Sequence, residues 1–168
     1  MKRRLFDFPD SVNEYAARTV AAGVLVMAVA YLATRWSWIL IVLAYGFVAR
    51  VASGPRFSPL GQLATRVIAP RLPWGPKPTP GPPKRFAQSI GAVVTLTAVV
   101  VRFGFGAVGF SMVLAGLMVV AAGLESGLGY CIGCKIFALL MKAGMIPEAV
   151  CEACADLSRP RPGAQQLA

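Results

Sequence analysis

Residues 105–124 read Phe105-Gly-Ala-Val-Gly-Phe-Ser-Met-Val-Leu-Ala-Gly-Leu-Met-Val-Val-Ala-Ala-Gly-Leu124, a run of twenty residues without a charge. A helix rises about 1.5 Å per residue, and the apolar core of a bilayer is about 30 Å thick. A helix over this run is therefore long enough to cross a membrane. The stretch predicts a transmembrane helix.

Three more apolar runs precede this one, at residues 16–34, 36–53 and 86–102. The 168-residue chain is 57% hydrophobic and only 14% charged, with a mean hydropathy of +0.64. Soluble domains carry about 25% charged residues, so this deficit is typical of membrane proteins. We expect an all-α integral membrane fold with four transmembrane helices in two hairpins. It would comprise a membrane domain at residues 1–128 and a short two-helix tail at residues 129–168.

The start of the first span carries a helix signal. Ser11 and Glu14 have the spacing of a capping box, which predicts that the helix begins near Val12. A cleaved signal peptide is the alternative, because Ala28-Val-Ala30 resembles a cleavage site. The lead-in is long and acidic for a signal peptide, and a second span follows at once. We therefore expect an uncleaved membrane anchor.

The connection between the second and third spans has two parts. Ser58 and Pro59 form a typical N-cap and first helical residue, and apolar residues follow at helical spacing. These features predict an amphipathic helix at residues 59–69 that lies in the membrane interface. Residues 70–83 contain seven prolines, too many for a helix or a sheet. This part is predicted to form a semi-rigid extended strap.

Basic residues are distributed unequally about the four spans. The chain has seventeen Lys and Arg against seven Asp and Glu. Both ends and the long connection share one side, which holds fifteen basic residues, whereas Arg35 and Arg102 fall on the other. Basic residues favour the cytoplasmic face and anionic lipid headgroups. We expect a multi-pass protein of the cytoplasmic (inner) membrane, with both termini in the cytoplasm and no nucleic-acid partner. Arg50, in the last turn of the second span, is expected to snorkel to the headgroups.

Four cysteines are the most obvious reactive groups, and the chain has no histidine. They form two pairs, Cys131-Ile-Gly-Cys134 and Cys151-Glu-Ala-Cys154. Acidic residues surround the second pair and should disfavour thiolates there; they are Glu148, Glu152 and Asp156. The two pairs are therefore expected to differ in how readily they form thiolates, as a relay between them needs.

The first pair is a candidate redox or sulfur-relay site. Gly127 and Gly129 should break or kink the chain after the last span, so that Tyr130 or Cys131 can open a new helix. At about 100° per residue, Lys135 and Lys142 then share the helix face of Cys131 and Cys134. A thiolate is favoured at a helix N-terminus, beside lysine and in C-x-x-C. We expect Cys131 to attack, Cys134 to resolve, and the two lysines to stabilise the thiolate, with a thioredoxin-like partner.

Two other interpretations of the cysteines stay open. The spacing C-x2-C-x16-C-x2-C is typical of a structural zinc site with four thiolate ligands, here Cys131, Cys134, Cys151 and Cys154. A non-enzymatic scaffold with such a site is the alternative function. Cysteine is also a small apolar residue that is often simply buried. Zinc is the one cofactor that the sequence suggests.

Transport is a third function class. It needs polar groups that face a path through the membrane. Within the expected spans the sequence offers little besides Thr95, Thr97 and Ser111. Four spans make a narrow bundle, so a transporter would have to be a homo-oligomer.

Several stretches resemble a domain-of-unknown-function family of small bacterial membrane proteins, closest to its actinobacterial branch. They are Val12-Asn-Glu14 with Arg18, Gly54-Pro-Arg-Phe-Ser-Pro59, Pro80-Gly-Pro-Pro-Lys-Arg-Phe-Ala-Gln-Ser-Ile-Gly91 and Leu124-Glu-Ser-Gly-Leu-Gly-Tyr-Cys-Ile-Gly-Cys134. The resemblance implies four spans, with the first cysteine pair at the core of the family pattern and the second pair less general. It also implies thioredoxin-like or sulfurtransferase partners.

Overall fold

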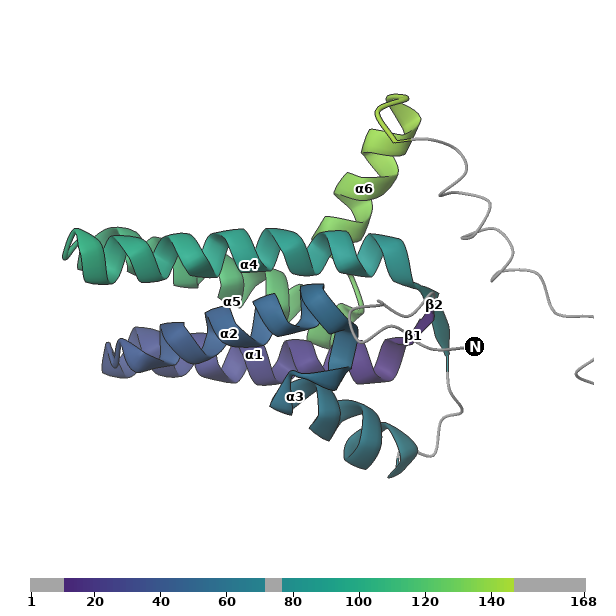
Figure 1. The fold of residues 1–168 in the computed structure, drawn as a ribbon, viewed down its shortest axis with the longest axis horizontal. Coiled ribbons are helices and arrows are strands. Elements are labelled where there is room, and N and C mark those ends of the chain that lie inside the picture. The colour runs from purple at the N-terminus through teal and green to yellow at the C-terminus, as the bar shows by residue number, and fades with distance from the viewer. Residues whose placement is uncertain (1–10, 72–76, 147–168) are drawn as a thin grey trace, which may run out of the picture.

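The computed structural model describes residues 11–71 and 77–146 and confirms an all-α fold with four helices long and apolar enough to cross a membrane (Figure 1). The long helices are α1 (Glu14–Thr34), α2 (Trp38–Ser53), α4 (Gly81–Gly104) and α5 (Val108–Leu128). They lie roughly alongside one another. The α1–α2 and α4–α5 connections lie at one end of the bundle, and the N-terminal part of the described chain lies at the other.

The principal helix contacts run between the two sequence hairpins. Helix α1 packs most extensively against α5, and α2 packs against α4, whereas α1 and α2 touch less. Each helix thus has its main partner in the other hairpin. This pairing holds the two halves of the chain together as one bundle.

Many small residues lie in the interior of the bundle together with a few large ones such as Tyr31 and Leu43, and large apolar residues cover its outside. Buried alanines are spread over all four long helices; they include Ala16, Ala28, Ala44, Ala98, Ala115 and Ala122. Exposed side chains include Val26, Val42, Val93, Val113 and Val120. Small residues let helix backbones approach closely, and lipid makes an apolar exterior favourable. This arrangement is typical of helices packed within a bilayer.

The predicted start of the first helix is wrong in detail. Ser11 lies in a short strand, β1 (Ser11–Asn13), and α1 is capped by the Asn13 side chain, which accepts from the Tyr15 N–H at 3.0 Å. Strand β1 pairs antiparallel with β2 (Pro78–Pro80). Glu14 does not close a capping box: its carboxylate lies 2.8 Å from the Lys77 ammonium.

The predicted strap is also wrong in part. Residues 78–80 form strand β2, and α4 begins at Gly81, five residues before the predicted span. A ribbon of two strands has only edges, where proline is tolerated. Pro82 and Pro83 lie in the first turn of α4, where backbone N–H groups have no partner within the helix. The proline content therefore excludes neither element.

Ser58 and Pro59 open a helical segment as predicted, with the Ser58 hydroxyl accepting from the Gly61 N–H at 3.2 Å. The segment is α3 (Pro59–Gln62), a π-helical turn (Leu63–Ile68) and a 3-10 turn (Ala69–Arg71). Gly61 and Ala64 are buried in this segment, while Leu63 is exposed. Placement of this segment in the membrane interface stays a prediction.

Overpacking the interior should destabilise the bundle far more than enlarging its exterior. Ala28 is fully buried, whereas Ala22, on the same helix, is exposed. We expect Ala28→Leu to lower the free energy of unfolding by about 1–3 kcal/mol, because a closely packed core has no room for the side chain. Ala22→Leu should leave it nearly unchanged. Unfolding of both variants by SDS titration in mixed micelles tests this, and equal losses would contradict the packing.

Candidate functional site

The first cysteine pair lies where the chain leaves the bundle. Helix α5 ends at Leu128, and Gly129 follows as its C-cap in the left-handed conformation, with a φ of 67°. Cys131 is the N-cap of α6 (Ile132–Lys142), and Cys134 lies in its first turn. The break at Gly129 and the new helix at Cys131 are as expected, although α5 continues past Gly127 to Leu128.

Helix α6 is fixed against the start of α4. A Cβ on Gly133 would lie 2.6 Å from the Ala87 Cα, so only glycine allows this approach. The Phe86 and Phe137 rings pack with their centroids 5.6 Å apart. These contacts hold α6, which begins after Cys131, against the first part of α4 (Figure 1).

The two thiols are unequal. Cys131 is buried and Cys134 is partly exposed. A hydrogen bond from the Cys134 thiol lowers the pKa of Cys131 from 9.0 to about 7, against the opposing effect of burial. The positive charge of Lys84 and the backbone amide of Cys134 also favour the Cys131 thiolate, whereas Glu125 disfavours it. The pKa of Cys134 is raised, chiefly because its proton is held by Cys131.

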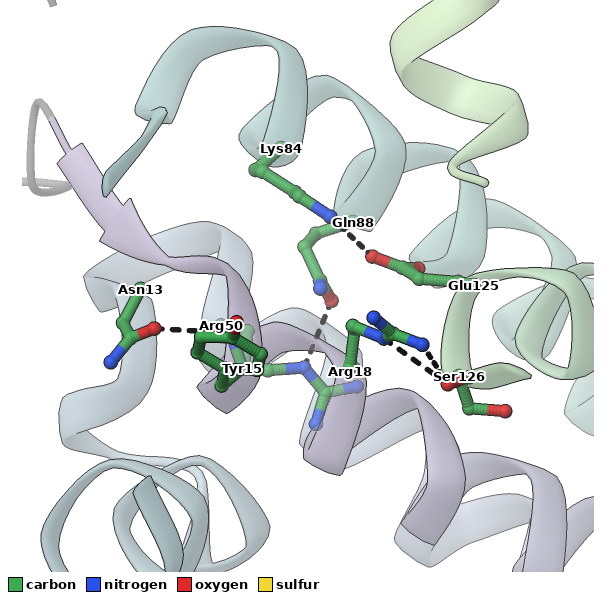
Figure 2. A network of polar contacts seen from close by, with 8 residues as sticks. All are labelled: Asn13, Tyr15, Arg18, Arg50, Lys84, Gln88, Glu125 and Ser126. Carbon is green, nitrogen blue, oxygen red and sulfur yellow. Dashed lines mark hydrogen bonds and ion pairs between the residues drawn. The ribbon is translucent and has the colours of Figure 1, made fainter. Parts of the chain in front are cut away.

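A buried ion pair lies beside the thiols. The Lys84 ammonium, at the start of α4, is 2.5 Å from a Glu125 carboxylate oxygen, in the last turn of α5 (Figure 2). The side chains are only 7% and 18% exposed. A charge in such a place is retained only when it is paired, because its transfer out of water costs several kcal/mol.

Arg50 does not snorkel as expected. It is only 5% exposed, and its Nε donates to the Gln88 Oε1 at 2.9 Å (Figure 2). Its Nη1 donates to the Ser58 hydroxyl at 3.1 Å, and its guanidinium lies 4.5 Å from the Phe47 ring centroid. The guanidinium also interacts electrostatically with Glu125. Arg50 therefore belongs to the buried polar cluster.

Arg18 joins the cluster from α1. Its guanidinium donates to the Ser126 carbonyl at 3.2 Å and to the Gly127 carbonyl at 2.6 Å. These carbonyls end α5 and have no partner within the helix, and a cation is favoured at the negative end of the helix dipole. Arg18 thus fixes the turn that leads to the cysteines.

The sequence did not identify Lys84 as the cation near the thiols, because it lies 47 residues before Cys131. Arg50 and Gln88 were missed as site residues for the same reason. Glu125 is near Cys131 in sequence, but its role depends on the pairing with the distant Lys84. For Arg50 the sequence offered one signal of a functional role, because this arginine stands alone beside an apolar run. The Lys135 ammonium lies 5.6 Å from the Tyr130 ring centroid.

Several site predictions remain untested. The roles of Lys135 and Lys142 as thiolate stabilisers are predictions still, and Lys142 lies in the last turn of α6. Cys151 and Cys154 lie outside the described residues, so the four-thiolate zinc site stays a prediction. Within residues 11–71 and 77–146, no three cysteine, aspartate or glutamate side chains are grouped closely enough for a metal.

A cavity of about 290 Å³ adjoins the polar cluster. Cys131, Glu125, Arg50 and Gln88 are among its lining residues, and nearly all the others are apolar or small. The lining comes from α1, α2, α4, α5 and α6. A thiol that favours its charged form thus lies in the wall of a mainly apolar cavity.

These features define a helical bundle of membrane-spanning dimensions with a dithiol, a buried ion pair and an apolar cavity at one end. The chain belongs to the family described as Domain of unknown function (DUF4395), which matches residues 12–142. The matched region includes Cys131 and Cys134 and ends before Cys151. No curated protein and no solved structure matches the chain.

The buried ion pair gives a stability prediction. Glu125→Gln should lower the free energy of unfolding by about 3–5 kcal/mol, because it leaves the buried Lys84 ammonium unpaired. Glu14→Gln breaks the pair with Lys77, whose side chain is 64% exposed, and should change stability much less. SDS titration in mixed micelles measures both.

The double variant Lys84→Met/Glu125→Leu serves as the control, since it removes both charges. It should recover most of the stability lost in Glu125→Gln. A double variant as unstable as the single one would contradict a role of charge pairing.

Proposed function

We propose that the protein is a membrane-anchored thiol redox or sulfur-relay module, with Cys131 as the attacking thiol and Cys134 as the resolving thiol. The observation that carries this proposal is the pair of free thiols at the start of α6, with Cys131 as the N-cap of the helix and the Lys84 charge near enough to favour its thiolate. A thiolate is the nucleophile in disulfide exchange and in transfer of sulfane sulfur. A pKa of about 7 makes the Cys131 thiolate abundant at neutral pH.

The pKa of Cys131 is lowered and that of Cys134 is raised, which suits a reaction in which Cys131 attacks first and Cys134 second. The Cys131 thiolate attacks a partner's disulfide, forms a mixed disulfide and releases one partner thiolate. This step removes the negative charge that held the Cys134 proton. Cys134 then loses its proton and attacks the Cys131 sulfur, which forms the Cys131–Cys134 disulfide and releases the second partner thiolate. The reverse sequence reduces the partner.

The partner would be a soluble thioredoxin-like or sulfurtransferase protein. Cys134 is partly exposed at the end of the bundle, where such a protein can approach. Lys135 and Lys142 on α6 would add positive charge near the thiols. Cys151 and Cys154 would form the second pair of the relay.

We also propose that this end faces the cytoplasm. Ten described basic residues belong to elements or element ends at the cysteine end of the bundle: the start of α1, the end of α2, the connection from α2 to α4, the start of α4, and α6 (Figure 1). They are Arg18, Arg50, Arg56, Arg66, Arg71, Lys77, Lys84, Arg85, Lys135 and Lys142. Arg35, in the α1–α2 connection, and Arg102, in the last turn of α4, lie at the other end. The bias predicts insertion in the cytoplasmic membrane, with anionic headgroups at the basic end.

A metal and thiol count separates the redox function from a zinc-stabilised scaffold. The protein purified in detergent without added metal should contain no zinc and should show reversible two-electron oxidation of Cys131 and Cys134. One zinc per chain, with thiols that react only after chelation, would establish the scaffold instead. Elemental analysis and thiol titration before and after a mild oxidant provide the measurement.

The pH dependence of alkylation tests the assigned thiol. In a Cys151→Ser/Cys154→Ser background, iodoacetamide should modify Cys131 first, with a rate that rises through about pH 7 as the thiolate forms. Cys134→Ala removes the principal hydrogen bond to the thiolate, so it should move this midpoint to higher pH. Mass spectrometry locates the label. An unshifted midpoint in Cys134→Ala would rule out the hydrogen bond as the cause.

A further inference from the structure

The cavity beside Cys131 has a polar end and an apolar body. Glu125, Arg50 and Gln88 line it near the thiol, whereas Val24, Val94 and Met118 are among its apolar lining. Its wall therefore changes from charged to hydrocarbon along the helices. A ligand that matches it has one polar end and an apolar remainder.

The size and opening of the cavity restrict the ligand further. Ligand pockets in proteins commonly measure about 300–1,000 Å³, so 290 Å³ suits a compact ring system. Two lining side chains, Leu117 and Ile136, are 57% and 40% exposed, so the cavity opens on the bundle surface there. That surface is apolar. The ligand would therefore enter from the lipid.

We propose that this cavity binds the ring of a lipid-soluble quinone, which accepts two electrons from the Cys131–Cys134 dithiol. The proposal rests on the thiol redox function and extends it by naming the class of electron acceptor. The protein would thus pass electrons from a soluble thiol protein to a membrane quinone.

The polar end favours a quinone over a simple acyl chain. The Arg50 and Glu125 side chains at the polar end already have partners within the protein, so a hydrocarbon chain would make no polar contact with them. A quinone carbonyl accepts hydrogen bonds. Gln88 accepts from Arg50 through its Oε1, so its amide nitrogen has N–H groups available for an acceptor (Figure 2). Arg50 itself is cationic and stabilises the negative charge that grows on a quinone oxygen during reduction.

The chemistry balances within the dithiol and the quinone. The Cys131 thiolate adds to an electron-poor ring carbon, forming an S–C bond, and the carbonyl oxygen that gains the electron pair takes one proton from solvent. The Cys134 sulfur then attacks the Cys131 sulfur. The S–C bond breaks, its electron pair stays on the ring, and the Cys134 proton passes to the second oxygen. One disulfide and one hydroquinone result.

The test uses the full chain in lipid nanodiscs, reduced and free of oxygen, with Cys151→Ser/Cys154→Ser so that only the first pair is counted. Decylubiquinone is the probe, because its fully substituted ring limits nonspecific thiol addition. We expect loss of two free thiols per quinone reduced. Ala121→Phe, which places a ring in the cavity, should slow this reaction roughly tenfold or more. Ala22→Phe, on the exposed face of α1, should not.

Oxidised glutathione is the second oxidant and reaches the thiols from water. It should oxidise wild type and Ala121→Phe at the same rate, which also shows that the cysteine end of the variant is folded. Val94→Phe fills the same cavity from α4 and replaces Ala121→Phe if the latter does not fold. If decylubiquinone does not oxidise the dithiol, or oxidises it at the same rate in wild type and the cavity-filled variants, the quinone site alone is overturned. Failure of both oxidants to form the disulfide would overturn the thiol function as well.

Discussion

The buried pair of Lys84 and Glu125 is the interaction on which the cysteine end of the molecule depends. It joins the first turn of α4 to the last turn of α5, which are 41 residues apart in sequence. Helix α6 begins a few residues after Glu125 and packs back on α4 near Lys84. The pair thus fixes the two elements between which the thiols lie. Its charge also acts on the thiols, because Lys84 favours the Cys131 thiolate and Glu125 opposes it.

The polar cluster is concentrated at one end of an otherwise apolar bundle. Arg18 binds the carbonyls at the end of α5, and Arg50 is held by Gln88 and Ser58. Toward the other end of the bundle the described polar contacts include the Tyr31 hydroxyl, 2.7 Å from the Ser111 hydroxyl. Charged groups at the end of a bundle can be paired without placing a charge at the bilayer centre. This arrangement combines stable helix packing with a reactive, charged end.

Much of the fold followed from sequence because it depends on local properties. Apolar run length identified four helices, and Ser58 and Gly129 marked boundaries that the structure retains. The errors arose where a partner distant in sequence decides the local structure. Pro78–Pro80 forms a strand because Ser11–Asn13 pairs with it, and Asn13 replaces Ser11 as the helix cap. The buried state of Arg50 likewise depends on Gln88, 38 residues away.

The sequence by itself determined the helical membrane-type architecture, the unequal distribution of charge and the presence of a C-x-x-C pair after a helix break. Hydropathy, charge and glycine conformation are properties of short segments, so no knowledge of neighbours is needed. Only the tertiary structure decided that α1 packs on α5 and α2 on α4. It also decided that Lys84 and Glu125 form an ion pair beside the thiols and that an apolar cavity adjoins Cys131. The physical reason is that these features depend on which helix faces meet, and four apolar helices with similar exteriors can pair in several ways until side-chain size and buried charge select one.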